Sequence, residues 1–226
     1  MTPERRGTRR ERRLGSSVVA DTLTGNESLH LPEFGAPPAD PIGLLDRWLG
    51  IAAEHGVREP LAVALATVDA RGHPASRIVL VKEVTADALM FSTNGDSRKG
   101  RHLAAMPFAS MTFYWRETLQ QITVAGPVAM LSDEQSTALF AERPLAAQAT
   151  TAVSHQSQPL DDEQSLHERA AELIDAGEPL SRPRCWAGYR LVPHRIEFWQ
   201  GRSNRLHRRL EYTLDGITWT SQRLQP

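Results

Sequence analysis

The sequence predicts an α+β domain built around an antiparallel β-barrel, and three observations support this fold class. Short apolar runs with strand character recur along the chain and are joined by hairpin-like turns. Helical segments are inserted between these runs without the regular alternation of parallel βαβ units. The 226 residues are 40% hydrophobic and 23% charged, which suits one globular domain of ordinary size, alone or with a tail.

The first 30 residues are the expected tail. They lack hydrophobic periodicity and are rich in Arg, Ser, Thr and Gly, so we expect a disordered arm over 1–30 and one domain over 31–226. Residues 1–13 hold six Arg and two Glu, a net charge of +4 against −5 for the rest of the chain. The stretch that follows is too short and too polar for a signal peptide. The arm could close over an anionic substrate, contact the acidic body or have no role.

Composition and missing motifs exclude several classes of function. The single cysteine, Cys185, excludes an internal disulfide and fits a reducing compartment, so we expect a cytoplasmic protein. The sequence has no apolar run of roughly 18 residues to cross a membrane, and no basic stripe with interleaved aromatics to bind nucleic acid. It also lacks metal-ligand motifs, GxGxxG and the P-loop signature, so we expect no metal, Rossmann dehydrogenase or NTPase.

Local signals define the first elements. Asp40 can cap a helix with Pro41 at its first position, and apolar residues at helical spacing continue to about 55. Apolar runs over 61–68 and 75–84, separated by a turn, predict a β-hairpin.

The second strand of this hairpin carries a basic residue on each face. Side chains alternate along a strand, so Arg77 shares one face with two valines, and Lys82 shares the opposite face with two aliphatic residues.

The rest of the chain predicts further strands with helices inserted between them, about seven or eight strands in all. Gly126 and Pro127 are expected to interrupt a long strand, as at a bulge or a sheet edge. In chain order we expect a strand at 89–93, a helix at 97–106, strands at 108–115 and 119–130, a helix at 132–143, a partly helical segment at 144–157, a helix at 161–176, and strands at 185–192, 195–200, 206–214 and 216–222.

The segment 91–103 has the strongest local signal for a binding site. A strand ends here in an Asn-Gly-Asp turn, and Ser97 can cap the helix that follows. Arg98 and Lys99 then fall in the first helical turn, where unpaired N–H groups already carry partial positive charge. A phosphate would offset this charge, although both side chains could instead point into solvent. The amino-acid usage argues against exposure to solvent. The chain uses Arg for ordinary surface charge, and Lys99 and Lys82 are its only lysines.

Three sequence blocks together resemble the pyridoxamine 5′-phosphate oxidase-like flavoproteins. They are RIVLVK at 77–82, FSTNGDSRKG at 91–100 and EFWQGRSNRLHRR at 197–209, and the similarity extends from about residue 31 to 226. Within that family the chain is most similar to the flavin-dependent oxidases of phenazine biosynthesis, through LPEFGAPPADP, GVREPLAVALATVD and YWRETLQQI. The resemblance implies an antiparallel Greek-key split β-barrel with flanking helices, and a homodimer that binds FMN at the interface between subunits.

The same resemblance assigns residues to the cofactor. Arg98 and Lys99 would hold the FMN phosphate, and Gln121 would contact the isoalloxazine. Trp199 and Arg209 would complete the site from the partner subunit. Pattern alone favours a core position for Trp199 and an exposed polar position for Gln121. The residues implied to bind FMN are Arg77, Ile78, Val79, Leu80, Lys82, Ser92, Thr93, Arg98, Lys99, Gln121, Gln156, Ser157, Trp199 and Arg209.

Arg205 and His207 are the implied catalytic residues. They are two apart on an expected strand, so their side chains would face the same way. Arg can fix a carboxylate or an anionic ring, and His can exchange a proton near neutral pH. Without the resemblance, a surface Arg–His pair is an equal interpretation.

The substrate side departs from the family pattern. The family has a Tyr where this chain has Leu139 and a Ser where it has Ala147. Each lost hydroxyl removes roughly 1–3 kcal/mol of hydrogen bonding from a phosphate site. The residues that the resemblance places around the substrate are Lys82, Arg143, Arg205 and His207.

These departures favour a flat aromatic substrate with less phosphate. The leading expectation is an FMN-dependent oxidase of a dihydro- or tetrahydrophenazine carboxylate, with a hydride equivalent passing to the flavin, dioxygen as final acceptor and hydrogen peroxide as product. Two alternatives stay open. One is a pyridoxamine/pyridoxine 5′-phosphate oxidase that makes pyridoxal 5′-phosphate, which the retained Lys82 favours. The other is a flavin-binding split-barrel protein without turnover.

Overall fold

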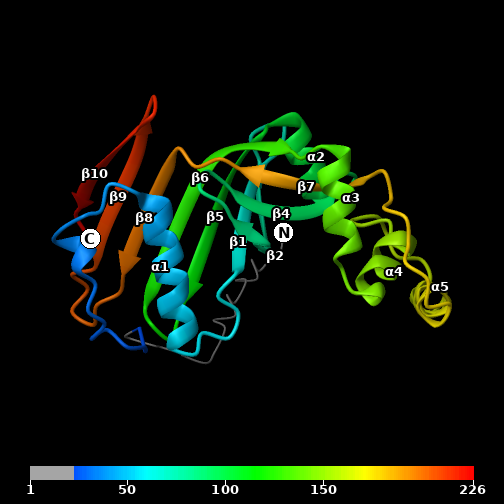
Figure 1. The fold of residues 1–226 in the computed structure, drawn as a ribbon, viewed down its shortest axis with the longest axis horizontal. Helices are drawn as coiled ribbons and strands as arrows, with labels where there is room; N and C mark the ends of the chain where they lie inside the picture. Colours follow the sequence, from blue (N-terminus) through cyan, green and yellow to red (C-terminus); the bar gives the residue numbers. More distant parts are fainter. Residues whose placement is uncertain (1–22) are drawn as a thin grey trace, which may run out of the picture.

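The computed structural model describes residues 23–226, and their strands form one curled antiparallel sheet (Figure 1). The main path of the sheet runs β10-β9-β8-β6-β5-β1-β2, while β7 joins β6 to β4, and β4 pairs with β3. The α+β class and the antiparallel pairing are thereby confirmed. The strands are β1 Ala62–Val68, β2 Pro74–Leu80, β3 Glu83–Val84, β4 Leu89–Asn94, β5 Phe108–Trp115, β6 Gln120–Met130, β7 Trp186–Leu191, β8 Arg195–Gln200, β9 Arg208–Asp215 and β10 Thr218–Leu224.

The helices lie on one face and at one end of this sheet (Figure 1). α1 crosses the sheet face, whereas α3, α4 and α5 gather beside β4 and β7, away from the C-terminus. None of the helices in residues 23–226 is both long and apolar enough to cross a membrane. The helices are a short 3-10 turn η1 Pro32–Phe34, then α1 Pro41–Glu54, α2 Arg98–Ala105, α3 Asp133–Ala141, α4 Leu145–Val153 and α5 Glu163–Asp175.

The core lies between α1 and the sheet. The Asp40 side chain accepts a hydrogen bond from the Ile42 N–H, which fixes the start of α1 as expected. The apolar face of that helix then buries Leu45 and Trp48 completely. The Trp48 ring meets the Phe198 ring of β8 edge to face, with 5.1 Å between ring centroids.

Two expectations about strands are corrected. The run expected at 75–84 is split, because β2 ends at Leu80 and β3 pairs with β4. Gly126 does not interrupt β6, which is continuous and pairs with β5 and β8 before it reaches β7. A Cβ at Gly126 would lie 1.9 Å from the Val192 carbonyl oxygen, so the glycine permits a close backbone crossing.

Part of the expected arm contacts the body of the protein. Residues 1–22 lie outside the described residues, but 23–30 are described and carry specific contacts. The Asn26 N–H donates to the Glu117 carbonyl at 2.8 Å, and Leu29 packs against the core. The packed chain therefore begins before residue 31, the expected boundary.

Candidate functional site

Three adjoining cavities form a trough along β2, β4, α2 and α4. The central cavity has a volume of about 360 Å³. A cationic cavity of about 450 Å³ shares Ile78, Lys99 and Gln156 with it, and a distal cavity of about 360 Å³ shares Lys82, Ser92 and Arg143. The predicted residues that line the central cavity are Ile78, Val79, Leu80, Lys82, Ser92, Thr93, Lys99, Arg143 and Gln156, and those that the cationic cavity adds are Arg77, Arg98 and Ser157.

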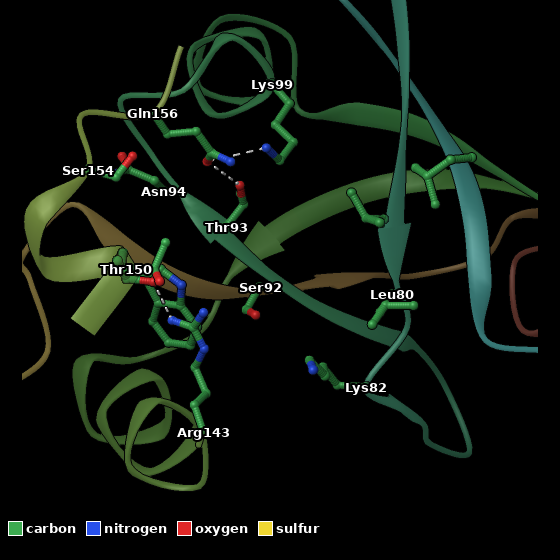
Figure 2. Close-up of a pocket in the computed structure, with 14 residues that line it drawn as sticks. Leu80, Lys82, Ser92, Thr93, Asn94, Lys99, Arg143, Thr150, Ser154 and Gln156 are labelled. Carbon is green, nitrogen blue, oxygen red and sulfur yellow. Dashed lines mark hydrogen bonds between the residues drawn. The ribbon is translucent and has the colours of Figure 1, made fainter. Parts of the chain in front are cut away.

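The strand alternation in β2 is confirmed and supplies one wall of the trough. Arg77 and Val79 are half-buried, whereas Ile78 and Leu80 are 68% and 51% exposed. Lys82 follows beyond the end of β2 and reaches the open space from the same side as Leu80 (Figure 2). The exposed face of this edge strand is therefore apolar, with a single cation at its end.

The cationic cavity is built at the N-terminus of α2. The Ser97 side chain caps the helix by accepting from the Gly100 N–H, as predicted. The segment after α4 closes over the helix start: the Ser157 hydroxyl accepts from the Arg98 N–H at 3.1 Å, and the Gln156 Oε1 accepts from the Lys99 ammonium at 3.4 Å. Figure 2 shows Lys99 and Thr93 converging on the Gln156 amide.

This helix start gathers positive charge without an acidic partner. Burial lowers the pKa of Lys99, and the neighbouring charge of Arg77 lowers that pKa further. Burial and the charge of Arg98 lower the pKa of Arg77, whose guanidinium donates to the Leu65 carbonyl and the Thr67 hydroxyl. In residues 23–226 none of the ion pairs involves these three cations. An anion entering here would relieve the mutual repulsion of the cluster.

Ser157 adopts a strained backbone conformation beside this cluster. Its φ is 74°, in the left-handed region that a serine rarely adopts. Such strain costs roughly 1–3 kcal/mol and is typical of binding sites, where the surrounding contacts hold it. Here the strained residue presents its hydroxyl to the start of α2.

The distal cavity combines charges of both signs with apolar side chains. Lys82 and Arg143 lie on opposite sides of the open space, with Ser92 between them (Figure 2). Leu139 and Ala147, the two departures from the family pattern, line the same cavity. Two carboxylates, Glu83 and Glu142, complete its charged lining.

Arg143 is held in place by neutral groups. Its guanidinium donates to the Thr151 hydroxyl at 2.6 Å and lies 5.1 Å from the Trp186 ring centroid and 5.5 Å from that of Phe140. Burial lowers its pKa. The guanidinium is thus oriented by a hydroxyl and two rings.

The other predicted site residues lie elsewhere on the sheet. Gln121 and Trp199 face each other across β6 and β8, and Arg209 pairs with Trp199 across β8 and β9. Three strands, β6, β5 and β1, separate β8 from β2. The Arg209 guanidinium binds both carboxylate oxygens of Glu197, at 2.7 and 3.0 Å. The structure therefore divides the predicted site into the trough and a second group around β8 and β9.

The expected strand geometry of Arg205 and His207 is wrong. β9 begins only at Arg208, and both residues lie in the turn that precedes it. Arg205 has a φ of 67°, and its carbonyl accepts from the His207 N–H at 2.9 Å, so the chain turns sharply between them. Any shared orientation of the two side chains would come from this turn.

The turn fixes the protonation of His207. The His207 Nδ1 accepts a hydrogen bond from the Arg202 N–H at 3.1 Å, which requires Nδ1 to be unprotonated. Nε2 therefore carries the proton of the neutral ring. Burial, followed by the charge of Arg205, lowers the pKa of His207 and favours that neutral form. The ring also packs on Trp199, with 4.8 Å between centroids.

Several lining residues were missed at the sequence level. Asn94, Thr150, Ser154 and Trp186 line the central cavity but were not assigned to it. Thr150 and Ser154 are four apart on and just after α4, a spacing that puts both on one face, and this periodicity was the available signal. Among residues 23–226 no three metal-ligating side chains come together.

Comparison with known proteins identifies the family. Residues 50–175 match the family model described as pyridoxamine 5′-phosphate oxidase, and residues 186–226 match the pyridoxine 5′-phosphate oxidase C-terminal dimerisation region. The second match contains Trp199, Arg205, His207 and Arg209.

Relatives of two named activities are similarly close. The chain is 43% identical to a dihydrophenazinedicarboxylate synthase of Burkholderia lata, over 91% of this chain and 97% of the relative. It is 45% identical to a pyridoxine/pyridoxamine 5′-phosphate oxidase of Paraburkholderia phytofirmans, over 90% and 97%. The crystal structure of PhzG from Burkholderia lata in complex with tetrahydrophenazine-1-carboxylic acid superposes with a TM-score of 0.86 at 43% identity, covering 88% of this chain and 98% of that one.

The trough fits the cofactor of this family. FMN carries a phosphate and a flat ring system, and the trough offers an unpaired cation cluster at one end and the apolar face of β2 beside it. The dimerisation region supports a homodimer. The chain therefore belongs to the pyridoxamine 5′-phosphate oxidase family of FMN-dependent oxidoreductases.

Proposed function

We propose that this protein is an oxidase of phenazine biosynthesis, which oxidises a dihydro- or tetrahydrophenazine carboxylate at FMN with dioxygen as acceptor and hydrogen peroxide as product. The observation that carries the proposal is the distal cavity. A phosphate dianion there would find Leu139 and Ala147 in place of two hydroxyl donors, and Glu83 and Glu142 on the same lining. A flat ring edge suits this lining better.

Overall identity to relatives does not separate the two activities. The phenazine and pyridoxine relatives are 43% and 45% identical to this chain, so the choice depends on site residues. Lys82 and Arg143 are compatible with either substrate, since both could bind a carboxylate or a phosphate. The apolar pair Leu139 and Ala147 is the discriminating feature.

The trough assigns positions to the parts of the cofactor. Arg98 and Lys99 would bind the phosphate, with Arg77, Gln156 and Ser157 around it. The ring would lie along 78–80, close to Ser92 and Thr93. When bound, FMN supplies the two-electron redox chemistry, and the chain supplies orientation and charge.

We place the FMN site between two subunits. The trough lacks Gln121 on β6, and Trp199 and Arg209 on β8 and β9; two strands separate β6 from β2, and three separate β8 from it. The segment 186–226, which matches a dimerisation region, carries Trp199 and Arg209, and the exposed apolar Ile78 and Leu80 edge the trough. A second copy would therefore bring its β8–β9 end to the trough of the first.

Arg205 and His207 would then act on substrate from the second subunit. Arg205 would bind the substrate carboxylate, and the neutral His207 would donate its Nε2–H to the substrate ring. If turnover were unchanged in Arg205→Ala and His207→Asn variants with FMN fully bound, these roles would be wrong. The single cysteine supports a reducing, cytoplasmic setting for the reaction.

Mixing two variants of low activity tests the shared site directly. Arg98→Ala removes a trough residue and His207→Asn removes a β9-end residue, so each homodimer has two defective sites. A mixed dimer has one site with both defects and one with neither. Subunit exchange should restore about a quarter of the parent activity, because half of the dimers are mixed and half of their sites are intact. No recovery after verified exchange would contradict an interfacial site.

The substrate assignment is tested by assaying both substrate classes in air. The purified yellow protein should consume dioxygen with a reduced phenazine carboxylate and be bleached by it anaerobically. Pyridoxine 5′-phosphate should react far more slowly. Faster turnover of pyridoxine 5′-phosphate would favour the pyridoxine 5′-phosphate oxidase alternative, and no bleaching by either substrate would favour a binding protein without turnover.

A further inference from the structure

The segment before η1 lies against two loops of the body. On one side, the Asn26 N–H donates to the Glu117 carbonyl in the turn between β5 and β6. On the other, the segment reaches the turn that joins β8 to β9, which carries Arg205 and His207. This short stretch is thus tied to the part of the molecule that the proposed function places against the substrate.

Glu27 makes the contacts to the β8–β9 turn. Its carboxylate accepts from the Ser203 N–H at 2.8 Å and from the Ser203 hydroxyl at 3.0 Å. The Arg202 guanidinium returns a bond to the Glu27 carbonyl at 2.8 Å. The two Ser203 bonds lower the pKa of Glu27, which keeps it ionised and the contacts charge-assisted. Three bonds therefore join Glu27 to two neighbouring residues of the turn, one through a backbone N–H and two through side chains.

One of these two residues, Arg202, sets the tautomer of His207. The Arg202 N–H donates to His207 Nδ1, and the next N–H along the chain, that of Ser203, donates to Glu27. Glu27 therefore holds Arg202 from two sides: through the peptide bond that joins it to Ser203, and through the bond that its guanidinium makes to the Glu27 carbonyl. Through Arg202, the bonds made by Glu27 therefore help to hold the imidazole of His207 in place.

We propose that Glu27 is a positioning residue, which holds the β8–β9 turn so that His207 stays a neutral Nε2–H donor packed against Trp199. The importance of that donor for turnover rests on the proposed function, whereas the tautomer itself can be observed without any substrate. The N-terminal segment would then be part of the active site through its contacts with this turn.

The charges around His207 agree with this assignment. Arg205 and Arg202 belong to its own turn, Glu27 approaches from the N-terminal segment, and the neighbour on β8 is the uncharged Trp199. If the turn were released, the ring would lose the Arg202 N–H and become more hydrated. Its pKa would then move back up towards the ordinary value.

The test compares Glu27→Ala and Glu27→Gln with a matched control in the FMN-loaded dimer. Glutamine keeps an oxygen that can accept from the Ser203 N–H, so it should retain part of the effect. The control is Glu117→Ala, because Glu117 meets the same segment through its backbone carbonyl, which alanine keeps. Two readouts are needed: the ¹⁵N imidazole spectrum of His207, assigned with His207→Asn, and the pH profiles of kcat and KM.

We expect Glu27→Ala to mix the His207 tautomers, raise its pKa and lower kcat about tenfold, since small displacements of a reacting group are costly. Glu27→Gln should fall between, and Glu117→Ala should match the parent. An unchanged His207 spectrum in Glu27→Ala would overturn the inference. Mixed tautomers with an unchanged kcat would support the positioning role of Glu27, but they would contradict the role proposed for His207 in turnover. FMN content and circular dichroism show whether each variant is folded. If Glu27→Ala does not fold, the His207 spectrum of Glu27→Gln decides the question.

Discussion

Basic residues in the trough and on the paired strands at the C-terminal end have different bonding partners. On β8 and β9, Arg209 binds Glu197 through two hydrogen bonds, and Arg195 pairs with Glu211. We call these four residues the C-terminal ladder. In the trough, the Arg98 backbone N–H and the Lys99 ammonium bond to neutral groups, as does the guanidinium of Arg143 near the distal end.

This difference distinguishes charges that stabilise the fold through ion pairs from cations that are available to bind a ligand. A cation with a carboxylate beside it is already neutralised, and its removal leaves the partner uncompensated. A cluster of cations without carboxylates repels itself, so its removal should cost the fold little and cost ligand binding much. In this protein, the presence or absence of a carboxylate beside a cation therefore indicates its role more clearly than the positive charge alone.

The largest expected effect comes from emptying the cationic cavity. Replacing Arg98 and Lys99 together by alanine should weaken FMN binding by about 100-fold or more, since each charge-assisted hydrogen bond is worth roughly 1.5–3 kcal/mol. The melting temperature of the apoprotein should hold or rise, because the repulsion with Arg77 is relieved. Flavin fluorescence titrations and thermal melts measure the two quantities.

Arg101 supplies the control for this variant. It lies on the same helix, but its guanidinium donates to the Asp96 carbonyl outside the central cavity. Arg101→Ala should leave the affinity for FMN within a few-fold of the parent. Equal losses in both variants would mean that overall positive charge, and not this cavity, binds the phosphate.

The next largest effect tests the distal end of the trough. Leu139→Tyr with Ala147→Ser restores two hydroxyl donors beside Lys82 and Arg143, and should raise kcat/KM for pyridoxine 5′-phosphate about tenfold or more. Turnover of a reduced phenazine carboxylate should fall, because the cavity becomes smaller and more polar. Steady-state oxygen uptake with each substrate measures both changes. No gain with the phosphate ester would show that Glu83 and Glu142 dominate the choice.

Local signals predicted most elements, and the two failures among the strands arose from contacts with other strands. Alternating hydrophobicity located the strands, and Asp40 and Ser97 marked two helix starts by capping. The expected strand at 75–84 is split because β3 pairs with β4, and Gly126 allows the backbone after β7, far along the chain, to pass close to β6. The pattern of a single strand does not reveal which segment lies against it.

In the candidate site, too, features set by local sequence were predicted and features set by the fold were not. The cation cluster followed from a helix cap and two basic residues, because its geometry is local. Arg205 and His207 were expected to face the same way along a strand that begins near 206, whereas the turn that follows Gly201 continues to His207 and β9 begins only at Arg208. The separation of Trp199 from β2 could not be read from spacing, because it depends on the order of strands in the sheet.

A smaller effect should come from breaking the C-terminal ladder. Glu211→Gln removes the partner of Arg195 and keeps an acceptor for Gln222, so it should lower stability by about 1 kcal/mol and the melting temperature by ~2–4 °C. FMN affinity should stay unchanged, in contrast to the trough variant. Thermal melts and flavin titrations on one preparation make the comparison. A loss of FMN affinity larger than the loss of stability would show that the Arg195–Glu211 pair also supports the cofactor site.

The ladder variant also has a pH signature. Burial acts to raise the pKa of Glu211, but its bonds to Gln222 and Arg195 and the nearby arginine charges prevail and lower it. A lowered carboxyl pKa gives stability that is present above the unfolded value of about 4.3 and is lost as pH falls through the folded pKa. The difference between parent and Glu211→Gln should therefore shrink in acid.

The smallest expected effect is a shift in the pKa of His207, which lies where the two regions meet across the proposed interface. Burial and then Arg205 lower its pKa, so the ring should stay neutral below its ordinary value of about 6.5. The acid limb of kcat/KM should have its midpoint below that value and vanish in His207→Asn. Arg205→Gln removes the neighbouring charge and should move the His207 midpoint upwards, as measured by titrating the imidazole. Since the folded pKa is the lower one, the stability contributed by neutral His207 is complete above about 6.5 and is lost as pH falls towards the folded pKa. Because kcat/KM reports the pKa values of the free enzyme, a midpoint above about 6.5 would mean that a carboxylate of the second subunit faces this ring. The separation between the cations of the trough and the ion pairs of the ladder would then not hold in the dimer.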